Sequence, residues 1–232
     1  MIRKAIDKCG YPIVFSTSPG PTVPEKANHI STHANMWRIS GDFWDRWPDL
    51  DRAFDLLGHW QGVAHPGAFP DADMIPFGHI GIKCTIAGKD RQTRFTKDEQ
   101  HMLFSLWSIA PSPLILGNNL PDTDPWTLSM LTNDEVLSIN QDPLGLPAKR
   151  TILKPGVEVW VKELKDHSVA IGLFNRTKAE EQVDLNLGSL QLNGKQQLRD
   201  LWAHKDLGAV ETTYSTKVPS HGVVLLRATP AK

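Results

Sequence analysis

The hydrophobic pattern of the chain changes once, near Pro147, and this change limits the folds that the sequence can adopt. Before Pro147, short apolar runs alternate with segments of helical periodicity. After it, short strands that alternate apolar with polar residues are expected at residues 157–161, 169–173, 183–187, 198–202 and 223–226. Strands that alternate with helices pair in parallel through crossovers, and successive alternating strands form antiparallel sandwiches. The sequence therefore predicts an α/β domain over residues 1–147 and an antiparallel β-sandwich domain over residues 148–232.

The first domain is expected to contain four short strands separated by helices. The predicted strands are Ile13–Ser16, Met36–Ile39, a third that ends near Met74, and Leu114–Leu116. Helical spacing occurs over residues 2–9 and 50–57, and a third helix is expected after Thr96 because Thr96 and Glu99 form a capping-box signature.

Four strands are few for the fold that this pattern favours. A (β/α)8 barrel takes about 250 residues and eight parallel strands. Four parallel strands could also form a small open sheet, but the chain starts in mid-helix before its first strand. We therefore expect residues 1–147 to form the C-terminal half of a (β/α)8 TIM barrel.

Composition argues against several functional classes. The 25 basic and 26 acidic residues give a formal charge of −1, without the basic excess typical of proteins that bind nucleic acid or anionic membranes. No apolar run approaches the ~18 residues of a membrane span. The two cysteines, Cys9 and Cys84, cannot build a multi-cysteine metal site, and the pair His29 and His33 has no evident third ligand. We expect no nucleic-acid partner, no membrane insertion and no metal.

The densest cluster of chemically useful residues is NMWRISGDFWDRW, which begins at Asn35. Arg38 stands four residues before Asp42, and Trp37 precedes Arg38 directly. Arginine donates a planar fork to hydroxyl groups, tryptophan offers an apolar face to a sugar ring, and aspartate can carry a proton. The motif fits a sugar site, and it fits equally well a tryptophan-rich core with a surface Arg38–Asp42 pair.

A second cluster, FPDADMIP, follows the third predicted strand and contains Asp71 and Asp73. Carboxylates two residues apart at a strand end are expected to point the same way, so that they could share a site, hold two hydroxyl groups or bind a cation. The pattern alone favours an aspartate-rich turn that caps the next element. Glycoside hydrolysis needs two carboxylates, and the pair together with Asp42 supplies enough, although spacing does not assign their roles.

Five phrases, in order and spacing, carry a family resemblance over essentially the whole chain. These are PIVFSTSPG, NMWRISGDFWDRW, FPDADMIP, SPLILGNNL and INQDPLG, and they resemble glycoside hydrolase family 27, the α-galactosidase or melibiase family. The resemblance implies a (β/α)8 barrel followed by an antiparallel β-domain. It also implies retaining hydrolysis of terminal α-galactosyl residues of a carbohydrate substrate, with no cofactor.

The resemblance assigns roles to individual residues. Asp42 matches the family's general acid/base, and Arg38 matches an arginine that holds sugar hydroxyls close to that acid. Asp73 and Met74 match positions that line the sugar pocket, and Asp71 is expected to orient the loop. Trp37, within the first motif, is expected to contact the substrate.

Ser18 bears on which sugar is accepted. It matches a position where many α-galactosidases carry a larger residue that touches the C2 substituent of the sugar, and a serine leaves room, as in the related α-N-acetylgalactosaminidases. An α-N-acetylgalactosaminidase and a β-L-arabinopyranosidase are therefore alternatives, and so is a non-catalytic half-barrel that binds sugar or assembles with a partner.

The sequence departs from the family pattern at the nucleophile. The family's nucleophile is an aspartate after a lysine on the barrel strand that precedes the strand expected at Ile13–Ser16, and the resemblance places it upstream of Met1. We therefore expect the isolated 232-residue chain to be inactive as a retaining hydrolase. A half-barrel exposes strand edges, so we expect a homodimer or an N-terminal half-barrel as partner. The compartment stays open; a periplasmic or secreted location is compatible, with any signal peptide upstream.

Overall fold

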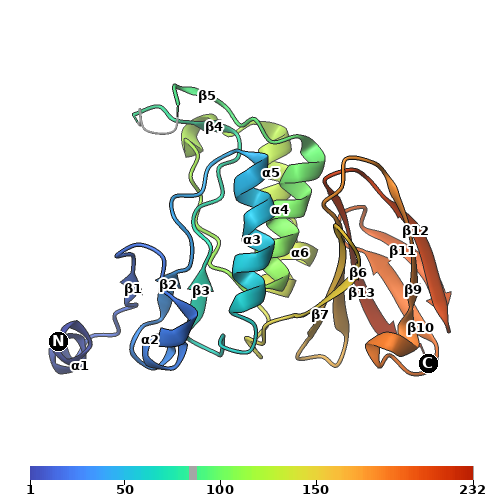
Figure 1. Cartoon of the computed structure of the whole chain (residues 1–232), viewed down its shortest axis with the longest axis horizontal. Helices are drawn as coiled ribbons and strands as arrows, with labels where there is room; N and C mark the ends of the chain where they lie inside the picture. The colour runs from blue at the N-terminus through green and yellow to red at the C-terminus, as the bar shows by residue number, and fades with distance from the viewer. Residues whose placement is uncertain (84–87, 232) are drawn as a thin grey trace.

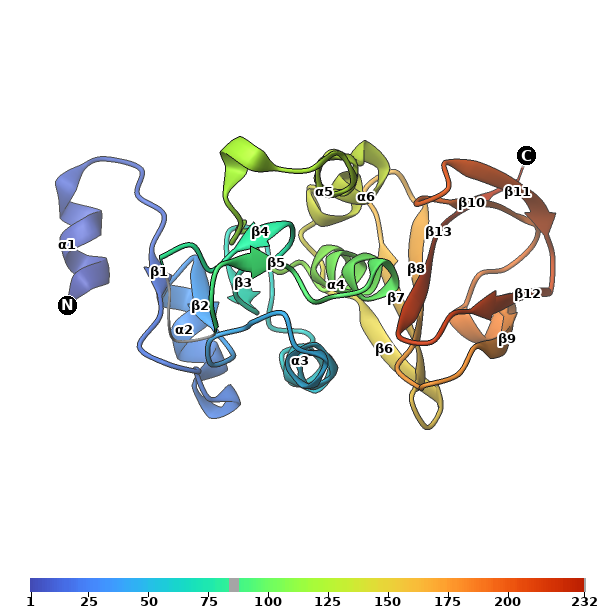
Figure 2. The same cartoon turned by 90° about the horizontal axis from the view of Figure 1, so that it is seen from above.

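The computed structural model describes residues 1–83 and 88–231, which form two parts along the chain (Figure 1). The N-terminal part combines a small parallel sheet with helices, and the C-terminal part consists of antiparallel strands. Two long helices, α3 (Trp47–His59) and α4 (Lys97–Ile109), lie between the parallel sheet and the antiparallel strands (Figures 1 and 2). The predicted class, an α/β part followed by an antiparallel β-sandwich, is confirmed. Cys84 lies outside the described residues.

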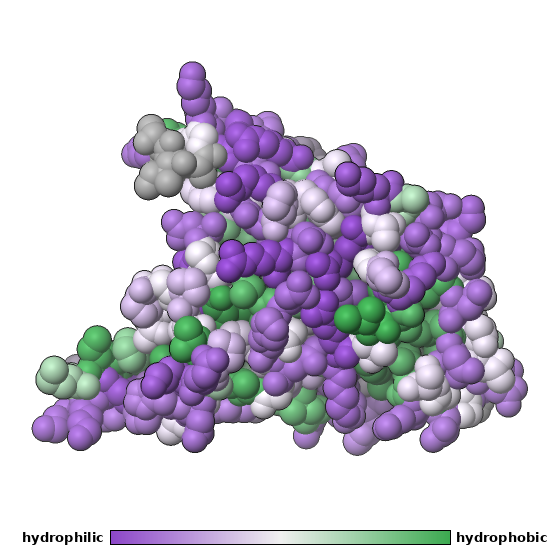
Figure 3. All heavy atoms as spheres, in the orientation of Figure 1, coloured by the Kyte–Doolittle hydropathy of each residue, from purple (hydrophilic) through white to green (hydrophobic). Residues whose placement is uncertain are grey.

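The parallel sheet has the order β1-β2-β3, with β1 at Ser16–Thr17, β2 at Met36–Arg38 and β3 at Phe69–Asp71. The first strand was expected over residues 13–16, but only Ser16 of that range belongs to β1. Pairing with β2 starts at Ser16↔Met36, and of the preceding apolar residues only Phe15 is half-buried and bonded to the start of β2, whereas Ile13 and Val14 have no ladder partner. They remain exposed, and Figure 3 shows apolar surface over this N-terminal segment.

The strand expected at Leu114–Leu116 is replaced by a single parallel bridge between Ile75 and Leu116. The Ile75 N–H donates to the Ile115 carbonyl at 2.7 Å, and Ile75 accepts from the Gly117 N–H at 3.0 Å. Proline has no N–H to continue a ladder, and prolines at positions 76 and 113 flank these segments. The fourth strand is therefore present only as this one bridge, beside β3.

The helices begin and end where local sequence rules place them. The helix expected over residues 2–9 is α1 (Ile2–Cys9), and Gly10 ends it in the left-handed conformation at φ 75°. The capping box is confirmed, because Thr96 accepts from the Glu99 N–H and Glu99 from the Thr96 N–H. The remaining elements of this part are α2 (Ala27–His33), α5 (Pro125–Leu131), α6 (Asp134–Asn140), β4 (His79–Ile80), β5 (Arg91–Gln92) and 3-10 turns at Pro24–Lys26 and Leu120–Asp122.

The C-terminal part is a sandwich of one large sheet and one strand pair. The large sheet has the order β11-β10-β13-β8-β7-β6, and β9 pairs with β12. The strands are β6 (Lys149–Lys154), β7 (Val157–Glu163), β8 (Val169–Asn175), β9 (Glu181–Asn186), β10 (Gln196–Asp200), β11 (Lys205–Val210), β12 (Thr213–Val218) and β13 (Gly222–Pro230), with a 3-10 turn at Leu187–Leu190. The sequence indicated β7, β8, β9, β10 and β13, and it missed the more exposed β6, β11 and β12.

One face of the large sheet packs against the β9–β12 pair, and the other face packs against the helices of the N-terminal part. Trp160 and Phe174, from neighbouring strands, are fully buried and meet Phe54 of α3 edge to face. Trp160 is thus a core residue, and Trp202 stacks on His101 of α4. The proposed domain boundary near residue 147 falls between the end of α6 and the start of β6.

Candidate active site

The carboxyl ends of the parallel strands bring together residues from both sequence motifs. Arg38, the last residue of β2, pairs in register with Asp71, the last residue of β3. Thr17 ends β1 opposite Trp37, so Ser18 follows at the level of Arg38. Side chains at this edge of a parallel α/β sheet form the active site in the barrel enzymes.

Arg38 connects the two carboxylates that the motifs contribute. Its Nη2 lies 2.9 Å from Asp73 Oδ2 and 3.5 Å from Asp42 Oδ1. The same nitrogen donates to the Gly41 carbonyl at 2.8 Å, which fixes the turn that leads to Asp42. The side chains differ in exposure, at 12% for Arg38, 17% for Asp73 and 76% for Asp42. The cluster therefore has a fixed inner ion pair and an outer carboxylate open to solvent.

Asp73 is held from three sides in a conformation unusual for its residue type. Its φ is 83°, in the region that favours glycine. Its N–H donates to Asp71 Oδ1 at 2.8 Å, its Oδ2 accepts from the Phe43 N–H at 2.8 Å, and its carbonyl accepts from Trp107 Nε1 at 2.9 Å. These bonds hold the left-handed backbone in place and tie the segment after β3 to the segment that carries Asp42.

The two carboxylates of the second motif therefore play different parts. Strand geometry ends at Asp71, because the backbone of Asp73 is left-handed, so the alternation from which the two side chains were expected to point the same way does not extend to Asp73. Asp71 is buried, and burial raises the pKa of its carboxyl even though the Asp73 N–H and the Arg38 charge act in the opposite direction. Asp71 thus accepts a hydrogen bond from within its own loop, whereas Asp73 pairs with Arg38.

A buried aspartate that the sequence interpretation missed anchors the loop on its far side. Asp45, three residues after Asp42, has no exposed side-chain surface. It accepts from Arg91 Nε at 3.0 Å, from Arg91 Nη2 and from the Arg94 N–H at 2.9 Å. The partners lie 46 and 49 residues further along the chain, so no local pattern could have paired them. Together with Phe43, this anchor leaves Asp42 on a short segment that is fixed at both ends.

The other expected site residues are placed as follows. Met74 is half-buried next to Asp73, and Ser18 is exposed at the end of β1. Trp37 is fully buried against Trp60, with ring centroids 5.5 Å apart. Successive strand residues face opposite sides, so Trp37 points into the core while Arg38 points to the site. The prediction that Trp37 contacts the substrate is therefore corrected.

No group of three or more histidine, cysteine, aspartate or glutamate side chains suited to a metal occurs in residues 1–83 and 88–231. His29 and His33 stack on each other at 4.5 Å, and His33 Nδ1 contacts the His29 carbonyl. Within the same described ranges, none of the helices has both the length and the apolar character that crossing a bilayer requires.

The geometry can be compared with known proteins at this point. Residues 1–142 match the family model described as alpha galactosidase A, and residues 154–228 match the alpha galactosidase C-terminal beta sandwich domain. The first match alone covers more than half of the chain. The chain belongs to glycoside hydrolase family 27.

Individual family members are similar over all or nearly all of the chain. Alpha-galactosidase 2 from Arabidopsis thaliana is 32% identical over 100% of the chain and 55% of its own length. The crystal structure of a family 27 β-L-arabinopyranosidase from Geobacillus stearothermophilus is 42% identical with a TM-score of 0.95, covering 99% of the chain and 53% of the enzyme. α-Galactosidase I from Mortierella vinacea, 23% identical, shares the fold with a TM-score of 0.85 over 99% of the chain and 62% of its own. The chain thus spans about half the length of the curated relatives that it matches.

Proposed function

We propose that the chain supplies the acid/base part of a retaining glycoside hydrolase active site. The observation that carries the proposal is the position of Arg38, within 2.9 Å of Asp73 and 3.5 Å of Asp42, at the carboxyl edge of the parallel strands in a family 27 chain. A cation fixed between two carboxylates, one of them open to solvent, suits a sugar whose leaving group must be protonated.

The proposed roles follow from exposure and contacts. Asp42, the most exposed member, donates a proton to the leaving glycosidic oxygen and later takes one from the attacking water. Arg38 and Asp73 hold hydroxyls of the sugar, because their inner ion pair presents both donors and acceptors beside Asp42. Met74 and Ser18 border the sugar pocket. Asp71 holds the loop that carries Asp73, and Asp45 holds the loop that carries Asp42. The nucleophile that a double displacement needs is expected from a residue outside these 232 positions.

Two sugars are the leading candidates for the substrate. The named family members support a terminal α-D-galactosyl residue. The similarity to the β-L-arabinopyranosidase, at 42% identity and a TM-score of 0.95, supports a β-L-arabinopyranosyl residue instead. The two sugars share the arrangement of their ring hydroxyls and differ in the hydroxymethyl group at C5, so one Arg38–Asp73 pair fits both. An α-N-acetylgalactosaminide remains the third candidate, because the small Ser18 leaves room at the sugar C2 position.

A chimera tests this proposal. Residues 1–232 replace the matching 53% of the Geobacillus enzyme, and the chimera is assayed with aryl β-L-arabinopyranoside and aryl α-D-galactopyranoside. Turnover of either substrate supports the proposal, and the ratio of the two kcat/KM values identifies the sugar. A correctly folded chimera that hydrolyses neither substrate, while the parent enzyme is active, contradicts it. The chain by itself is expected to show no hydrolysis in the same assay.

The assembly state is a separate part of the proposal. Exposed apolar residues lie before β1, including Tyr11, Ile13 and Val14. They support association with a second half-barrel, either a partner polypeptide or another copy of this chain. Sedimentation of the pure chain tests the second alternative, because a monomer at all concentrations excludes the homodimer.

A further inference from the structure

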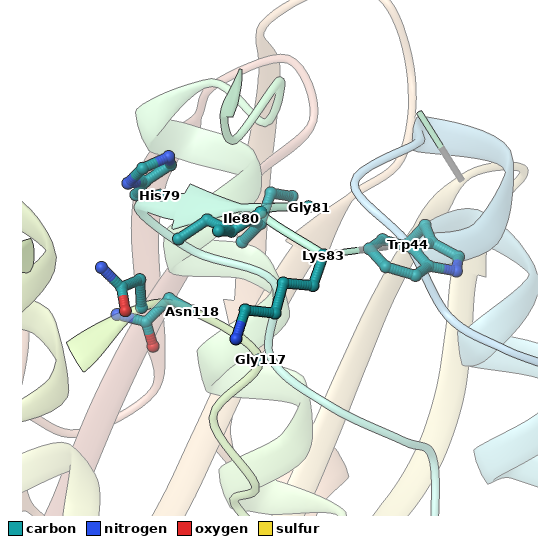
Figure 4. Close-up of a pocket in the computed structure, with 9 residues that line it drawn as sticks. Trp44, His79, Ile80, Gly81, Lys83, Gly117 and Asn118 are labelled. Carbon is teal, nitrogen blue, oxygen red and sulfur yellow. The ribbon is translucent and has the colours of Figure 1, made fainter. Parts of the chain in front are cut away.

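The acid/base loop, residues 42–46, has one open flank and leads directly into the start of α3. Trp44, in the middle of the loop, lines a hollow of about 430 Å³, and Figure 4 shows it across from His79 and Asn118. Because this flank borders open space, the position of the loop depends on what holds its other contacts, above all at the end that enters α3.

The first turn of α3 fixes the helix end of the loop. Asp49, in that turn, accepts from Arg46 Nε at 2.8 Å and from the Trp44 N–H at 3.4 Å. Trp44 and Arg46 therefore keep their places only while the first turn of α3 keeps its own. Whatever holds that turn also acts on the loop that carries Asp42.

A histidine of the sandwich covers the first residue of α3. His221 lies in the turn between β12 and β13 and stacks flat on Trp47, with ring centroids 3.4 Å apart and an angle of 2° between the ring planes. The His221 side chain is 21% exposed. The start of α3 is thus held by the other part of the molecule.

The same imidazole reaches the start of α4. Its Nδ1 lies 3.0 Å from Glu99 Oε1, and because a carboxylate only accepts, Nδ1 carries the hydrogen. The other oxygen, Oε2, accepts from the Thr96 N–H in the capping box. The Nε2 of His221 is buried without a hydrogen-bond partner among the described residues, so the Glu99 bond and the stack on Trp47 orient the ring.

Both helices that His221 contacts carry anchors of the acid/base loop. Trp47 follows the loop directly, and α4 starts shortly after Arg94, whose N–H donates to the buried Asp45 at 2.9 Å. His221 therefore lies where the two chain segments joined at Asp45 enter their helices. Loss of the imidazole is expected to loosen both segments.

The turn that presents His221 is itself fixed. The Gly222 N–H donates to the Pro219 carbonyl at 3.1 Å, while the His221 N–H and Ser220 Oγ both donate to the Thr177 carbonyl, at 3.3 and 2.9 Å. His221 has a φ of 49°, and such left-handed residues persist where their surroundings impose the conformation. The sandwich thus presents the imidazole in a preformed position.

We propose that His221 is a positioning residue for the acid/base, and that through it the sandwich fixes the loop that carries Asp42. The inference rests on the proposed role of Asp42. The Asp42 side chain is 76% exposed and has one long contact, at 3.5 Å to Arg38, so its position is set by its loop rather than by its own contacts. His221 acts through Trp47 and Glu99 and takes no part in the proton transfer.

Hydrogen exchange of the full chain tests the physical link. The amides of Phe43, Trp44 and Arg46 each donate a hydrogen bond, and in His221→Ala they are expected to exchange about tenfold faster, as for one lost hydrogen bond to a charged group. The matched control is His167→Ala, an exposed residue of the β7–β8 turn with a similar left-handed φ of 66°. It is expected to leave these amides unchanged.

A conservative variant separates positioning from a general loss of stability. His221→Phe keeps an aromatic ring against Trp47 and is expected to restore at least about half of the lost protection, on a logarithmic scale. Unchanged exchange in His221→Ala, equal acceleration in the loop and in β8, or no recovery in His221→Phe would each overturn the inference.

The chimera with the Geobacillus enzyme supplies a readout that a purely structural role would not change. His221→Ala is expected to lower kcat/KM about tenfold for a disaccharide and less than about twofold for a dinitrophenyl glycoside, whose leaving group needs no proton. Equal losses on both substrates overturn the inference. Asp42→Asn in the same chimera separates the two proposals. If it shows the leaving-group dependence and His221→Ala does not, only the role of His221 fails; if Asp42→Asn lacks it, the proposed acid/base role fails.

Discussion

The two parts of the molecule use charged residues in opposite ways. In the sandwich, strands of five to nine residues surround a continuous core, and the Glu158 carboxylate is only 2% exposed and fully paired. In the parallel part, strands of two or three residues end in charged groups, and the Asp42 side chain is 76% exposed. The long strands of the sandwich form a continuous packed core. The short parallel strands β1, β2 and β3, in contrast, place the polar residues at their ends along one edge of their sheet. The difference separates the buried carboxylate that contributes to stability, Glu158, from the exposed carboxylate for which we propose chemistry, Asp42.

The largest expected effect on stability lies in the contact between the two parts. Glu158 accepts from Arg150 at 2.6 and 2.8 Å, from Arg176 at 2.6 Å and from Trp160 at 3.0 Å, and both arginines reach acidic residues of α3. Burial alone raises the pKa of Glu158, but these hydrogen bonds outweigh it and hold the pKa below its ordinary value. Glu158→Ala leaves two cations without their buried partner and is expected to cost about 3–5 kcal/mol.

Urea unfolding measures this cost, with Glu163→Ala at the exposed end of the same strand as the control. A loss of unfolding free energy below about 1 kcal/mol would show that the hydrogen bonds of Glu158 contribute little net stability. The parallel part would then not depend on a charged contact with the sandwich.

Asp45 is the exception within the parallel part, because it is a buried structural carboxylate next to the site. Asp45→Asn keeps the shape of the side chain but removes the charge that Arg91 and the Arg94 N–H face. We expect a loss of about 2–3 kcal/mol, since hydrogen bonds to a buried charge are lost. Thermal unfolding of Asp45→Asn measures the loss, and hydrogen exchange of the amides at residues 42–46 is expected to become faster. Unchanged exchange would contradict the role of Asp45 as the loop anchor.

A weaker charged contact joins α6 to the sandwich and depends on pH. Arg199, bonded to both carboxylate oxygens at 2.7 Å, lowers the pKa of Glu135 to about 2, and His204 at 2.6 Å adds to the effect. Because the folded pKa lies below the unfolded one, this stabilisation is present above pH about 4.5 and is lost as the pH falls toward 2.

Glu135→Gln is therefore expected to cost about 1–2 kcal/mol at pH 6 and almost nothing near pH 2. Unfolding midpoints of the unmodified protein and of Glu135→Gln, measured between pH 2 and pH 6, test the direction of this pH dependence. The matched control is Glu180→Gln, whose partner Lys217 is exposed, and it is expected to show no such difference. A difference in stability between the unmodified protein and Glu135→Gln that widens as the pH falls would contradict the lowered pKa of Glu135.

The smallest expected stability effect is at the proposed acid/base itself. Asp42 has one long contact with Arg38, at 3.5 Å, and a largely exposed side chain, so Asp42→Asn is expected to change the unfolding free energy by less than about 0.5 kcal/mol. The same thermal measurement that is made for Asp45→Asn tests this. A loss as large as that of Asp45→Asn would make Asp42 a structural residue and would remove the contrast between the two parts.

Local signals in the sequence were sufficient for much of the fold. The capping box at Thr96 and the apolar spacing of α3 depend on residues within a few positions, and both predicted helices form. The extents of the parallel strands were less predictable, because pairing with a neighbour decides where a strand such as β1 begins. The exposed strands β6, β11 and β12 carry too few apolar positions to show a clear alternation.

The site residues also divide into those that the local sequence could identify and those that depend on packing or on distant partners. The motifs identified Arg38, Asp42 and Asp73, which the fold brings together, because these residues lie at strand ends that the pattern had located. The same motif could not separate the buried Trp37 from its neighbour Arg38, since strand faces alternate and only the packing against Trp60 decides which face is inside. Asp45 was missed because its partners lie more than forty residues away.

The most direct test of the proposed acid/base role of Asp42 introduces Asp42→Asn into the chimera described above. The measurement is the dependence of its kcat/KM on the leaving group of the substrate. If Asp42 protonates the leaving oxygen, the variant loses at least 100-fold in kcat/KM for a disaccharide and much less for a dinitrophenyl glycoside, whose leaving group needs no proton. Added azide, which needs no general base, should then restore turnover of the dinitrophenyl substrate. Equal losses on both substrates without azide rescue, or full activity of the variant on the disaccharide, would contradict the assignment of Asp42 as the acid/base.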